Sequence, residues 1–310
     1  MNTTSLVGKC LKLLQNHTKS ADYEFIAADI TNTCNLRCQF CVNDFSACSS
    51  KFVPMEKHTY LKMLKLLPLV PDGSFFISCL WEPTLHREFI DFLELIPVHL
   101  RNKVLFTTNL TLKLSDDFFQ RLSHISLHHI NISLDSLNPH VFESLRKGAK
   151  FEQFERNLNR LVEAFSQSKD APPIYYVTMI LKSNMEEIPS LVEKLNQKYL
   201  SRLNFPRYVY EVSHLSSQWK RENLLSNEDW DRFLSIDWPK NCVISSPPGV
   251  YYANDNEPYS RNFAPVISGN LPPALRISSS GDVESFYGKD FHVNLNDLDD
   301  PNEFFLYRKD

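Results

Sequence analysis

The eight residues CNLRCQFC, from Cys34 to Cys41, are the stretch around which the rest of the sequence is organised. Their three cysteines are separated by three residues and then by two. Thiolates so close in sequence bind zinc or an iron–sulfur cluster. Structural zinc sites and ordinary four-iron clusters take four protein ligands, so a group of three leaves one metal position open. An open position is typical of a reactive metal centre.

The cysteine stretch follows the first of six predicted strands. This strand lies in EFIAADITNTC, residues 24–34, an apolar run that leads directly into the cysteines. Similar runs predict strands at 73–79, 103–109, 129–136, 174–181 and 204–212. Apolar periodicity predicts helices between them, at 56–67, 87–96, from Ser115 through FFQRL, at 151–165 and at 186–198. The alternation is typical of parallel βα units, whose functional residues lie at the carboxyl ends of the strands.

Six units are too few for a closed eight-stranded barrel. The sequence therefore predicts an α/β fold, a partial (β/α)6 TIM-like barrel at 23–238 with a small C-terminal extension at 239–310. Residues 1–22 precede the barrel and include a predicted short helix at 5–16. In the extension, residues 239–274 carry seven of the 18 prolines and are predicted to be loop. ALRISSSGDVESF, at 274–286, predicts a β-hairpin around Ser-Gly, and the end of the chain predicts a capping turn and a short helix.

Composition excludes several classes of function. Hydrophobic residues make up 43% and aromatic residues 12% of the 310 residues, as in a globular protein with a large core. The net charge of -4 lacks the basic surplus of a nucleic-acid-binding protein. No signal peptide and no apolar run of roughly 20 residues is present, so no membrane association is expected. Seven cysteines, an odd number clustered at one site, argue against a disulfide framework and favour a cytoplasmic protein.

The cysteine stretch resembles the signature of the radical S-adenosylmethionine (radical SAM) enzymes. The resemblance implies that Cys34, Cys38 and Cys41 hold a [4Fe–4S] cluster whose fourth iron chelates S-adenosylmethionine. It also implies that Phe40 lies beside the adenine of that cofactor. The alternative from the residues alone is a set of structural cysteines, or a zinc site that a distant His or Cys completes.

Glu82 belongs to a second segment that resembles the family. CLWEPTLH, residues 79–86, is similar to the Gly-Gly-Glu-Pro stretch of radical SAM enzymes, which implies that Glu82 receives the ammonium group of S-adenosylmethionine. A carboxylate and an ammonium group form a charge-assisted hydrogen bond. Leu80 and Trp81 replace the two glycines, and this departure puts the local backbone geometry in question.

Four further segments match the family in the expected order. TTN at 107–109, SLD at 133–135, LRKGA at 145–149 and MILKSN at 179–184 resemble strand-end and neighbouring segments of radical SAM enzymes. The resemblance implies cofactor contacts for Asn109, Ser133 and Asp135. Arg146 is a candidate partner for the S-adenosylmethionine carboxylate, and a surface position is the alternative.

The C-terminal extension resembles that of the SPASM group of radical SAM enzymes, which normally holds auxiliary iron–sulfur clusters. Cys242 is its single cysteine and cannot ligate a cluster alone. We therefore expect a cluster-free extension that acts as a lid and substrate wall. Cys242 is a candidate hydrogen-atom donor to a substrate radical, as are Cys48 and Cys79, and a small buried hydrophobe is the alternative for each.

The resemblance implies that reductive cleavage of S-adenosylmethionine gives a 5′-deoxyadenosyl radical, which abstracts a hydrogen atom from a substrate C–H bond. Without auxiliary clusters we expect a redox-neutral outcome: isomerisation, epimerisation or elimination. The expected substrate is a small polar metabolite or a peptide, and the expected reductant is a flavodoxin or ferredoxin. A non-catalytic iron–sulfur or zinc protein on the same scaffold is the alternative. His86, His128 and His129 are weaker acid–base candidates.

Overall fold

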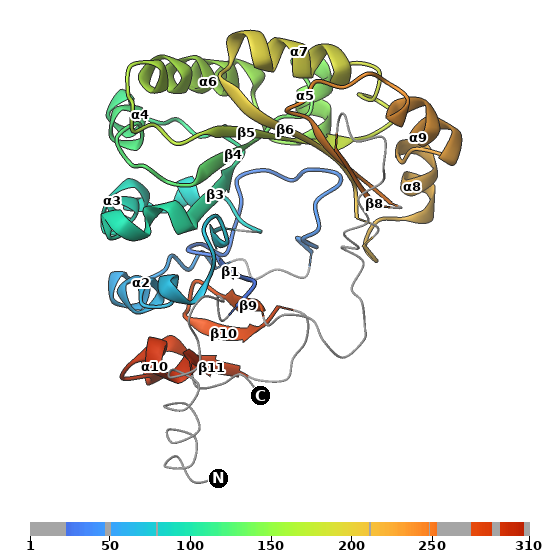
Figure 1. The fold of residues 1–310 in the computed structure, drawn as a ribbon. Coiled ribbons are helices and arrows are strands. Elements are labelled where there is room, and N and C mark those ends of the chain that lie inside the picture. The colour runs from blue at the N-terminus through green and yellow to red at the C-terminus, as the bar shows by residue number, and fades with distance from the viewer. Residues whose placement is uncertain are drawn as a thin grey trace. The chain divides into compact units, whose positions relative to one another are not determined.

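The computed structural model describes residues 23–46, 51–78, 80–210, 212–247, 249–252, 274–286 and 292–306. The chain forms two compact units (Figure 1). Unit 1 comprises Met1–Thr33, Lys51–Phe106 and Ser268–Asp310, and unit 2 comprises Cys34–Ser50 and Thr107–Ile267. The predicted helix at 5–16 and two of the candidate cysteines, Cys48 and Cys79, lie outside the described residues.

Strand β1 (Phe25–Ala28) is central to the sheet of unit 1. It pairs in parallel with β2 (Phe75–Ile77) on one side and with β9 (Ala274–Ile277) on the other. The order within this unit is β11-β10-β9-β1-β2-β3, with β3 at Val104–Thr108, β10 at Asp282–Ser285 and β11 at His292–Asn294. Parallel strands covered on both faces are apolar throughout, and Ile26, Ala27 and Ala28 are all buried.

The predicted hairpin at 274–286 is confirmed. Strands β9 and β10 pair antiparallel, and the Gly281 amide donates to the Ser278 carbonyl across the turn at 2.9 Å. Gly281 has a φ of +88°, and a Cβ there would lie 2.8 Å from Thr59 Cγ2, so only glycine fits this turn. The helical elements of unit 1 are α2 (Lys57–Leu64), η1 (Leu67–Leu69), η2 (Pro83–Leu85), α3 (Phe89–Glu94), η3 (Val98–Lys103), η4 (Leu295–Asp297) and α10 (Pro301–Leu306).

Unit 2 contains a second run of parallel strands. The order is β4-β5-β6-β7-β8, at His129–Ser133, Ile174–Ile180, Ser201–Tyr208, Val243–Ser246 and Gly249–Tyr252, with only β8 antiparallel to its neighbour. Alternate residues of β5 are buried, beginning at Ile174, and those between them are half-buried. The helices are α4 (Asp116–Leu122), α5 (Pro139–Leu145), α6 (Phe151–Ser166), α7 (Ile188–Lys198), α8 (Ser217–Asn223) and α9 (Asn227–Leu234).

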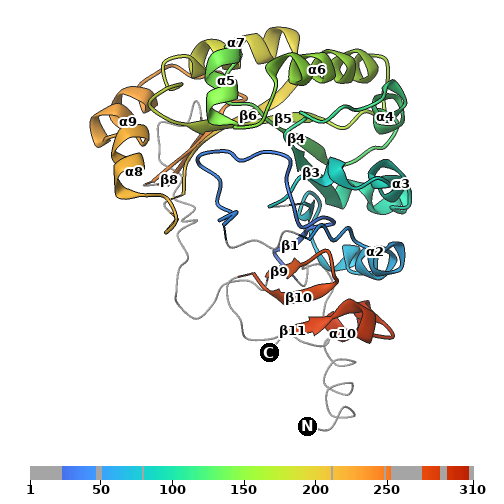
Figure 2. The same ribbon diagram turned by 180° about the vertical axis from the view of Figure 1, so that it is seen from behind.

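The two faces of the unit 2 sheet have different neighbours. Helices α5, α6 and α7 cover one face of β4–β6, while the loop at 34–46, drawn in blue, lies on the other side (Figures 1 and 2). Figures 1 and 2 view this arrangement from opposite sides and agree. The loop with the three cysteines therefore lies on the face that these helices leave uncovered.

The six predicted strands are all present, with ends that differ by a few residues. The prediction of loop at 239–274 is wrong for β7 and β8, which extend the sheet of unit 2. The prediction failed because Pro239 and Pro247 flank β7 and do not interrupt it. Strands β7 and β8 belong to unit 2, whereas β9, β10 and β11 belong to unit 1. No helix among the described residues is long and apolar enough to cross a bilayer.

Candidate functional site

The cysteine loop, residues 34–46, is fixed to the C-terminal end of α5. The Arg37 amide donates to the Lys147 carbonyl at 2.8 Å, and the Gln39 amide donates to the Leu145 carbonyl at 3.2 Å. Gly148 has a φ of +97°, and a Cβ at this position would lie 3.5 Å from the Asn35 carbonyl oxygen. That distance is ordinary van der Waals contact, so it is the left-handed backbone conformation that favours glycine here.

Asn109 connects the loop after β3 to the first cysteine. Its Nδ2 donates to Asn35 Oδ1 at 2.9 Å and lies 3.6 Å from Cys34 Sγ. Its Oδ1 accepts from the Thr111 amide and hydroxyl, at 2.9 and 2.6 Å, which fixes the orientation of the amide group. The predicted site residue Asn109 therefore contacts the cysteine loop directly.

Phe40 and Cys38 pack into an apolar cluster, which we name the loop cluster. Its buried members are Phe40, Leu145, Leu181, Val209 and Leu215, and the half-buried Cys38 and Met179 pack against it. Phe40 is buried, so the loop inserts this ring into the unit, whereas Cys34, Cys38 and Cys41 are half-buried. These apolar contacts hold the loop in place.

Asp135 and Arg146 form a buried ion pair beside Phe40. Arg146 Nε lies 2.8 Å from Asp135 Oδ2, but the donor geometry is not that of a hydrogen bond, so the contact is electrostatic. Asp135 Oδ1 accepts from the Met179 amide at 2.8 Å. The Arg146 Cζ atom lies 5.7 Å from the centre of the Phe40 ring. Arg146 is thus a buried residue, and its charge is balanced within the protein.

The Cys38 thiol is influenced by burial and by this ion pair. Burial raises the pKa of Cys38 to about 11, Arg146 lowers it, and Asp135 and Cys41 raise it. Burial lowers the pKa of Arg146, but the negative charges of Asp135 and the nearby thiolates outweigh this effect and raise it. Arg146 therefore favours the thiolate form of Cys38, although burial outweighs its effect.

The donors around the loop fit an iron–sulfur cluster. Cys34 Sγ accepts from the Leu36 amide and Cys41 Sγ from the Asn43 amide, both at 3.4 Å. Hydrogen bonds to cysteine sulfur are a general feature of iron–sulfur sites. Among the described residues no three His, Cys, Asp or Glu side chains converge on a single-ion position. A four-iron cluster instead binds each cysteine at a different iron, which spaces the sulfurs farther apart than around one zinc ion.

Two further predicted cofactor ligands are Ser133 and Glu82. Ser133 is the last residue of β4 and is half-buried. Glu82 belongs to unit 1, where it is 3% exposed and caps η2, with its Oε1 accepting from the Thr84 amide at 3.2 Å and hydroxyl at 2.6 Å. The Thr31 hydroxyl donates to the Glu82 carbonyl at 3.2 Å. Glu82 is therefore a buried carboxylate in a fixed position.

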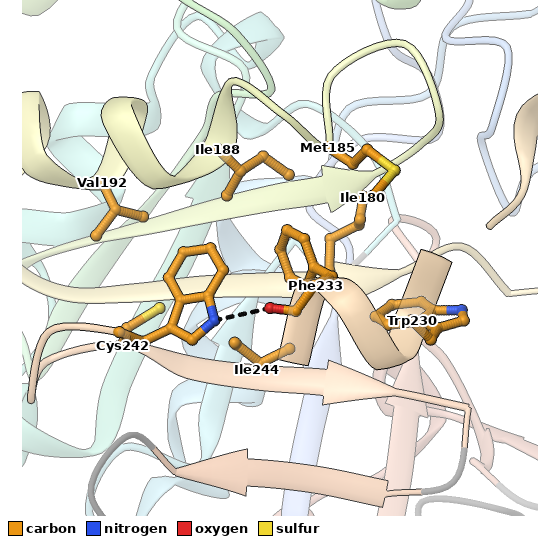
Figure 3. Close-up of a cluster of buried hydrophobic side chains, with 9 residues drawn as sticks. Ile180, Met185, Ile188, Val192, Trp230, Phe233, Cys242 and Ile244 are labelled. Carbon is orange, nitrogen blue, oxygen red and sulfur yellow. Dashed lines mark hydrogen bonds between the residues drawn. The ribbon is translucent and has the colours of Figure 1, made fainter. Parts of the chain in front are cut away.

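Cys242 lies in a separate apolar cluster, which we name the Cys242 cluster. Its other buried members are Ile180, Met185, Ile188, Val192, Trp230, Phe233, Trp238 and Ile244. Figure 3 shows Cys242 among these side chains, with a hydrogen bond of 3.1 Å from the Trp238 indole to the Phe233 carbonyl. Burial raises the pKa of Cys242 to about 12. Cys242 occupies the position of a small core residue and shares no cluster with the cysteine loop.

The three candidate histidines have structural contacts. His86 is buried, with Nε2 2.9 Å from the Met55 carbonyl. His128 and His129 have their Nδ1 atoms 2.6 Å apart, and His129 stacks on Tyr175 at 4.0 Å between ring centres. Burial, and then the neighbouring His128, lower the pKa of His129 to about 3. His129 is neutral at physiological pH.

Several residues of the site were not predicted. Asn35 joins Asn109 to Thr111, with its Nδ2 donating to Thr111 Oγ1 at 2.8 Å. His214 Nε2 lies 2.9 Å from the Cys41 carbonyl. Asn35 could have been predicted from its position inside the cysteine stretch. His214 lies more than 170 residues after Cys41 in the sequence, and no local sequence pattern indicates its role.

Comparison with known proteins agrees with this geometry. The Radical SAM superfamily pattern matches residues 29–195. GTP 3',8-cyclase of Shewanella denitrificans is 24% identical over 294 residues, covering 89% of this chain and 81% of that protein. GTP 3',8-cyclase of Peptoclostridium acidaminophilum is 27% identical over 248 residues, covering 77% of this chain and 71% of that protein.

Two solved structures show the same fold. Streptococcus suis SuiB bound to S-adenosylmethionine superposes with a TM-score of 0.60 at 13% identity, covering 94% of this chain and 67% of SuiB. The enzyme anSMEcpe with bound AdoMet gives a TM-score of 0.60 at 16% identity, covering 92% of this chain and 81% of anSMEcpe. The predicted α/β fold, a partial TIM-like barrel, is thereby confirmed. The chain belongs to the radical SAM superfamily and is an enzyme whose cofactors are a [4Fe–4S] cluster and S-adenosylmethionine.

Proposed function

We propose that this enzyme abstracts a hydrogen atom from a small polar metabolite and returns a product at the same oxidation level. The bound cluster and S-adenosylmethionine together supply a 5′-deoxyadenosyl radical for this abstraction. The observation that carries the proposal is the cysteine loop itself. Three half-buried cysteines lie in one loop, and backbone amides and Asn109 donate toward the sulfur atoms of two of them.

The described residues support a division of roles. Cys34, Cys38 and Cys41 would hold the cluster, and Phe40 would lie beside the adenine. The buried Glu82 carboxylate would accept the ammonium group of S-adenosylmethionine, and the free ends of the Arg146 guanidinium would bind its carboxylate. Because both Asp135 oxygens have protein partners, we assign Asp135 to orienting Arg146.

Asn109 and Ser133 complete the proposed cofactor site. Asn109 would hold Cys34 and the loop in position through its two bonds. Ser133 lies on the sheet face opposite the buried Ile132, where its half-buried hydroxyl would contact the ribose or methionine part of the cofactor.

The redox-neutral outcome rests on cysteine usage. Cys242 is the only cysteine after residue 79, so the C-terminal part of the chain offers no second set of cluster ligands. An oxidative reaction would need an acceptor for a further electron. The substrate class rests on the GTP 3',8-cyclases, whose name denotes a nucleotide reaction and whose identity of 24–27% exceeds the 16% of SuiB bound to its precursor peptide SuiA.

Isotope transfer tests the proposal. The enzyme is reconstituted anaerobically, reduced with flavodoxin or dithionite, and incubated in turn with deuterated forms of GTP, other nucleotides, sugars and peptides. We expect about four irons per chain, and deuterium from a small polar substrate in 5′-deoxyadenosine. Deuterium arriving only from a peptide would overturn the substrate class.

Two cysteine variants test the assignment of the cluster. Cys38→Ala should abolish both the cluster absorbance and the cleavage of S-adenosylmethionine, because it removes one of three ligands. The matched control is Cys242→Ala, a cysteine of the same unit outside the loop, which should retain both. Cleavage by Cys38→Ala at the wild-type rate would refute the assignment of the cluster.

A further inference from the structure

Arg207 lies next to the end of β6, in the region where parallel βα units carry their functional residues. The following residue, Tyr208, packs against the Cys242 cluster together with residues of α7 and α9. Successive side chains of a strand point to opposite faces. Arg207 therefore projects from the face that these helices leave uncovered.

This face is also the face of the cysteine loop. Arg207 pairs in register with Met179 on β5, and Met179 packs against the loop cluster that contains Phe40 and Cys38. On its other side Arg207 pairs with Ser245 of β7. Register partners in a parallel sheet lie side by side on one face, so Arg207 is one strand away from a residue that contacts the cysteine loop.

The guanidinium of Arg207 is incompletely satisfied. One Nη2 hydrogen bond, 2.9 Å long, goes to the Tyr210 hydroxyl. The Nε atom is buried and has no hydrogen-bond partner in the structure. No carboxylate of the described residues lies within ion-pair distance, whereas Arg146 has Asp135 and Arg276 has Asp29 and Glu284.

Aromatic rings balance the Arg207 charge only in part. Its Cζ lies 5.1 Å from the centre of the Tyr210 ring and 5.6 Å from that of Phe205. A ring face attracts a cation but accepts no hydrogen bond in the plane of the guanidinium. A buried N–H without an acceptor is costly, and arginine keeps its charge in proteins. The group that would satisfy Arg207 is thus an anionic hydrogen-bond acceptor that lies in the plane of its guanidinium.

We infer that Arg207 binds an anionic oxygen group of the substrate, a carboxylate or a phosphate, on the sheet face of the cysteine loop. Both groups match the planar donors of arginine, which bind two oxygens at once. The inference rests on the proposed function, because it identifies the substrate as a negatively charged metabolite. A nucleotide and an organic acid both meet this description.

Calorimetry with simple anions tests the inference. Reconstituted wild-type enzyme is titrated with inorganic phosphate and, separately, with acetate, at constant ionic strength. We expect saturable binding of at least one, and the tighter of the two identifies the group. Arg207→Gln should weaken this binding about tenfold or more, since it removes a charged donor. The absence of saturable binding of either anion to the wild type would overturn the inference.

Two further variants give the comparison a control. Arg202→Gln alters an exposed arginine of the same strand and should bind the anion as the wild type does. Arg207→Lys keeps the charge but loses the fork, so its affinity should lie between those of the wild type and Arg207→Gln. Circular dichroism checks that each variant folds. If Arg207→Gln does not fold, the anion affinity of Arg207→Lys serves as the test. Wild-type affinity in a folded Arg207 variant would refute the inference.

The outcomes separate this inference from the proposed function. Iron content and cleavage of S-adenosylmethionine are measured on the same preparations. If cleavage is normal and the Arg207 variants bind anions like the wild type, only the inference fails. If anion binding depends on Arg207 but no radical chemistry occurs, only the proposed function fails.

Discussion

Arg146 Nε lies 2.8 Å from Asp135 Oδ2, with the two side chains 6% and 0% exposed. Removing one member of a buried ion pair leaves the other charge without compensation. Asp135→Asn should therefore lower the free energy of unfolding by about 3 kcal/mol, measured by urea denaturation at neutral pH. The double variant Asp135→Asn with Arg146→Met removes both charges and should be more stable than the single one.

The exposed pair Glu152–Arg156 provides the matched control. Its members are 85% and 48% exposed, and Glu152→Gln should change stability by no more than about 0.5 kcal/mol. Equal effects of Asp135→Asn and Glu152→Gln would contradict a special role for burial.

Asn109→Ala should loosen the cluster without removing a ligand. The variant loses the donors to Asn35 and Cys34, so the loop is held less firmly. Loss of residues that support metal ligands typically costs 10- to 100-fold in metal affinity. We expect release of iron to a chelator, followed by absorbance, to be about tenfold faster. Asn131→Ala, which instead removes the hydrogen bond that Asn131 Nδ2 donates to Thr107 Oγ1, should release iron at the wild-type rate.

Local patterns predicted the strands well because most of them bury alternate or continuous apolar residues. Strand β5 was predicted at 174–181 and is observed at Ile174–Ile180. Helix α5 was missed although Asn138 caps it and Pro139 occupies its first turn, a readable start signal. The parallel pairing of β9 with β1 joins residues about 250 positions apart, and no local pattern carries that information.

The site shows the same division between local and distant information. The cysteines and Phe40 were found because they lie within eight residues of one another. Asp135 and Arg146 were predicted singly as cofactor contacts, whereas the structure pairs them with each other. Arg207 was missed because its lack of a counter-charge is a property of the fold around it.

Ser78→Gly should stabilise unit 1. Ser78 has a φ of 63°, a left-handed conformation that costs a residue with a Cβ of the order of 1 kcal/mol. Its hydroxyl is also buried without a hydrogen-bond partner. Glycine removes both costs, so we expect the midpoint of thermal unfolding to rise by about 2–4 °C. Ser78→Ala removes the hydroxyl alone and should give a smaller gain, and a fall with Ser78→Gly would contradict the argument.

His129 should make the protein sensitive to acid. Its pKa is lowered to about 3 in the folded protein, whereas an unfolded histidine titrates near 6.5. The unfolded state therefore binds more protons between these values, and stability falls as the pH drops from about 6.5 toward 3. From pH 7.5 to 5 the loss should be about 2 kcal/mol. His129→Phe keeps a ring against Tyr175 and should reduce this loss of stability between pH 7.5 and 5. His140→Phe, at an exposed histidine, should leave the loss unchanged.

Cys242→Ala should affect stability and leave the cluster unchanged. The side chain is fully buried among apolar residues of α7, α9 and β7, so removing its sulfur leaves a small cavity that costs about 1 kcal/mol. Cys242→Ser places a hydroxyl there and should cost more, because a buried polar group without a partner is penalised by about 1–3 kcal/mol. Iron content should stay at the wild-type value in both variants. A loss of product formation with iron, folding and S-adenosylmethionine cleavage intact would instead identify Cys242 as a hydrogen-atom donor.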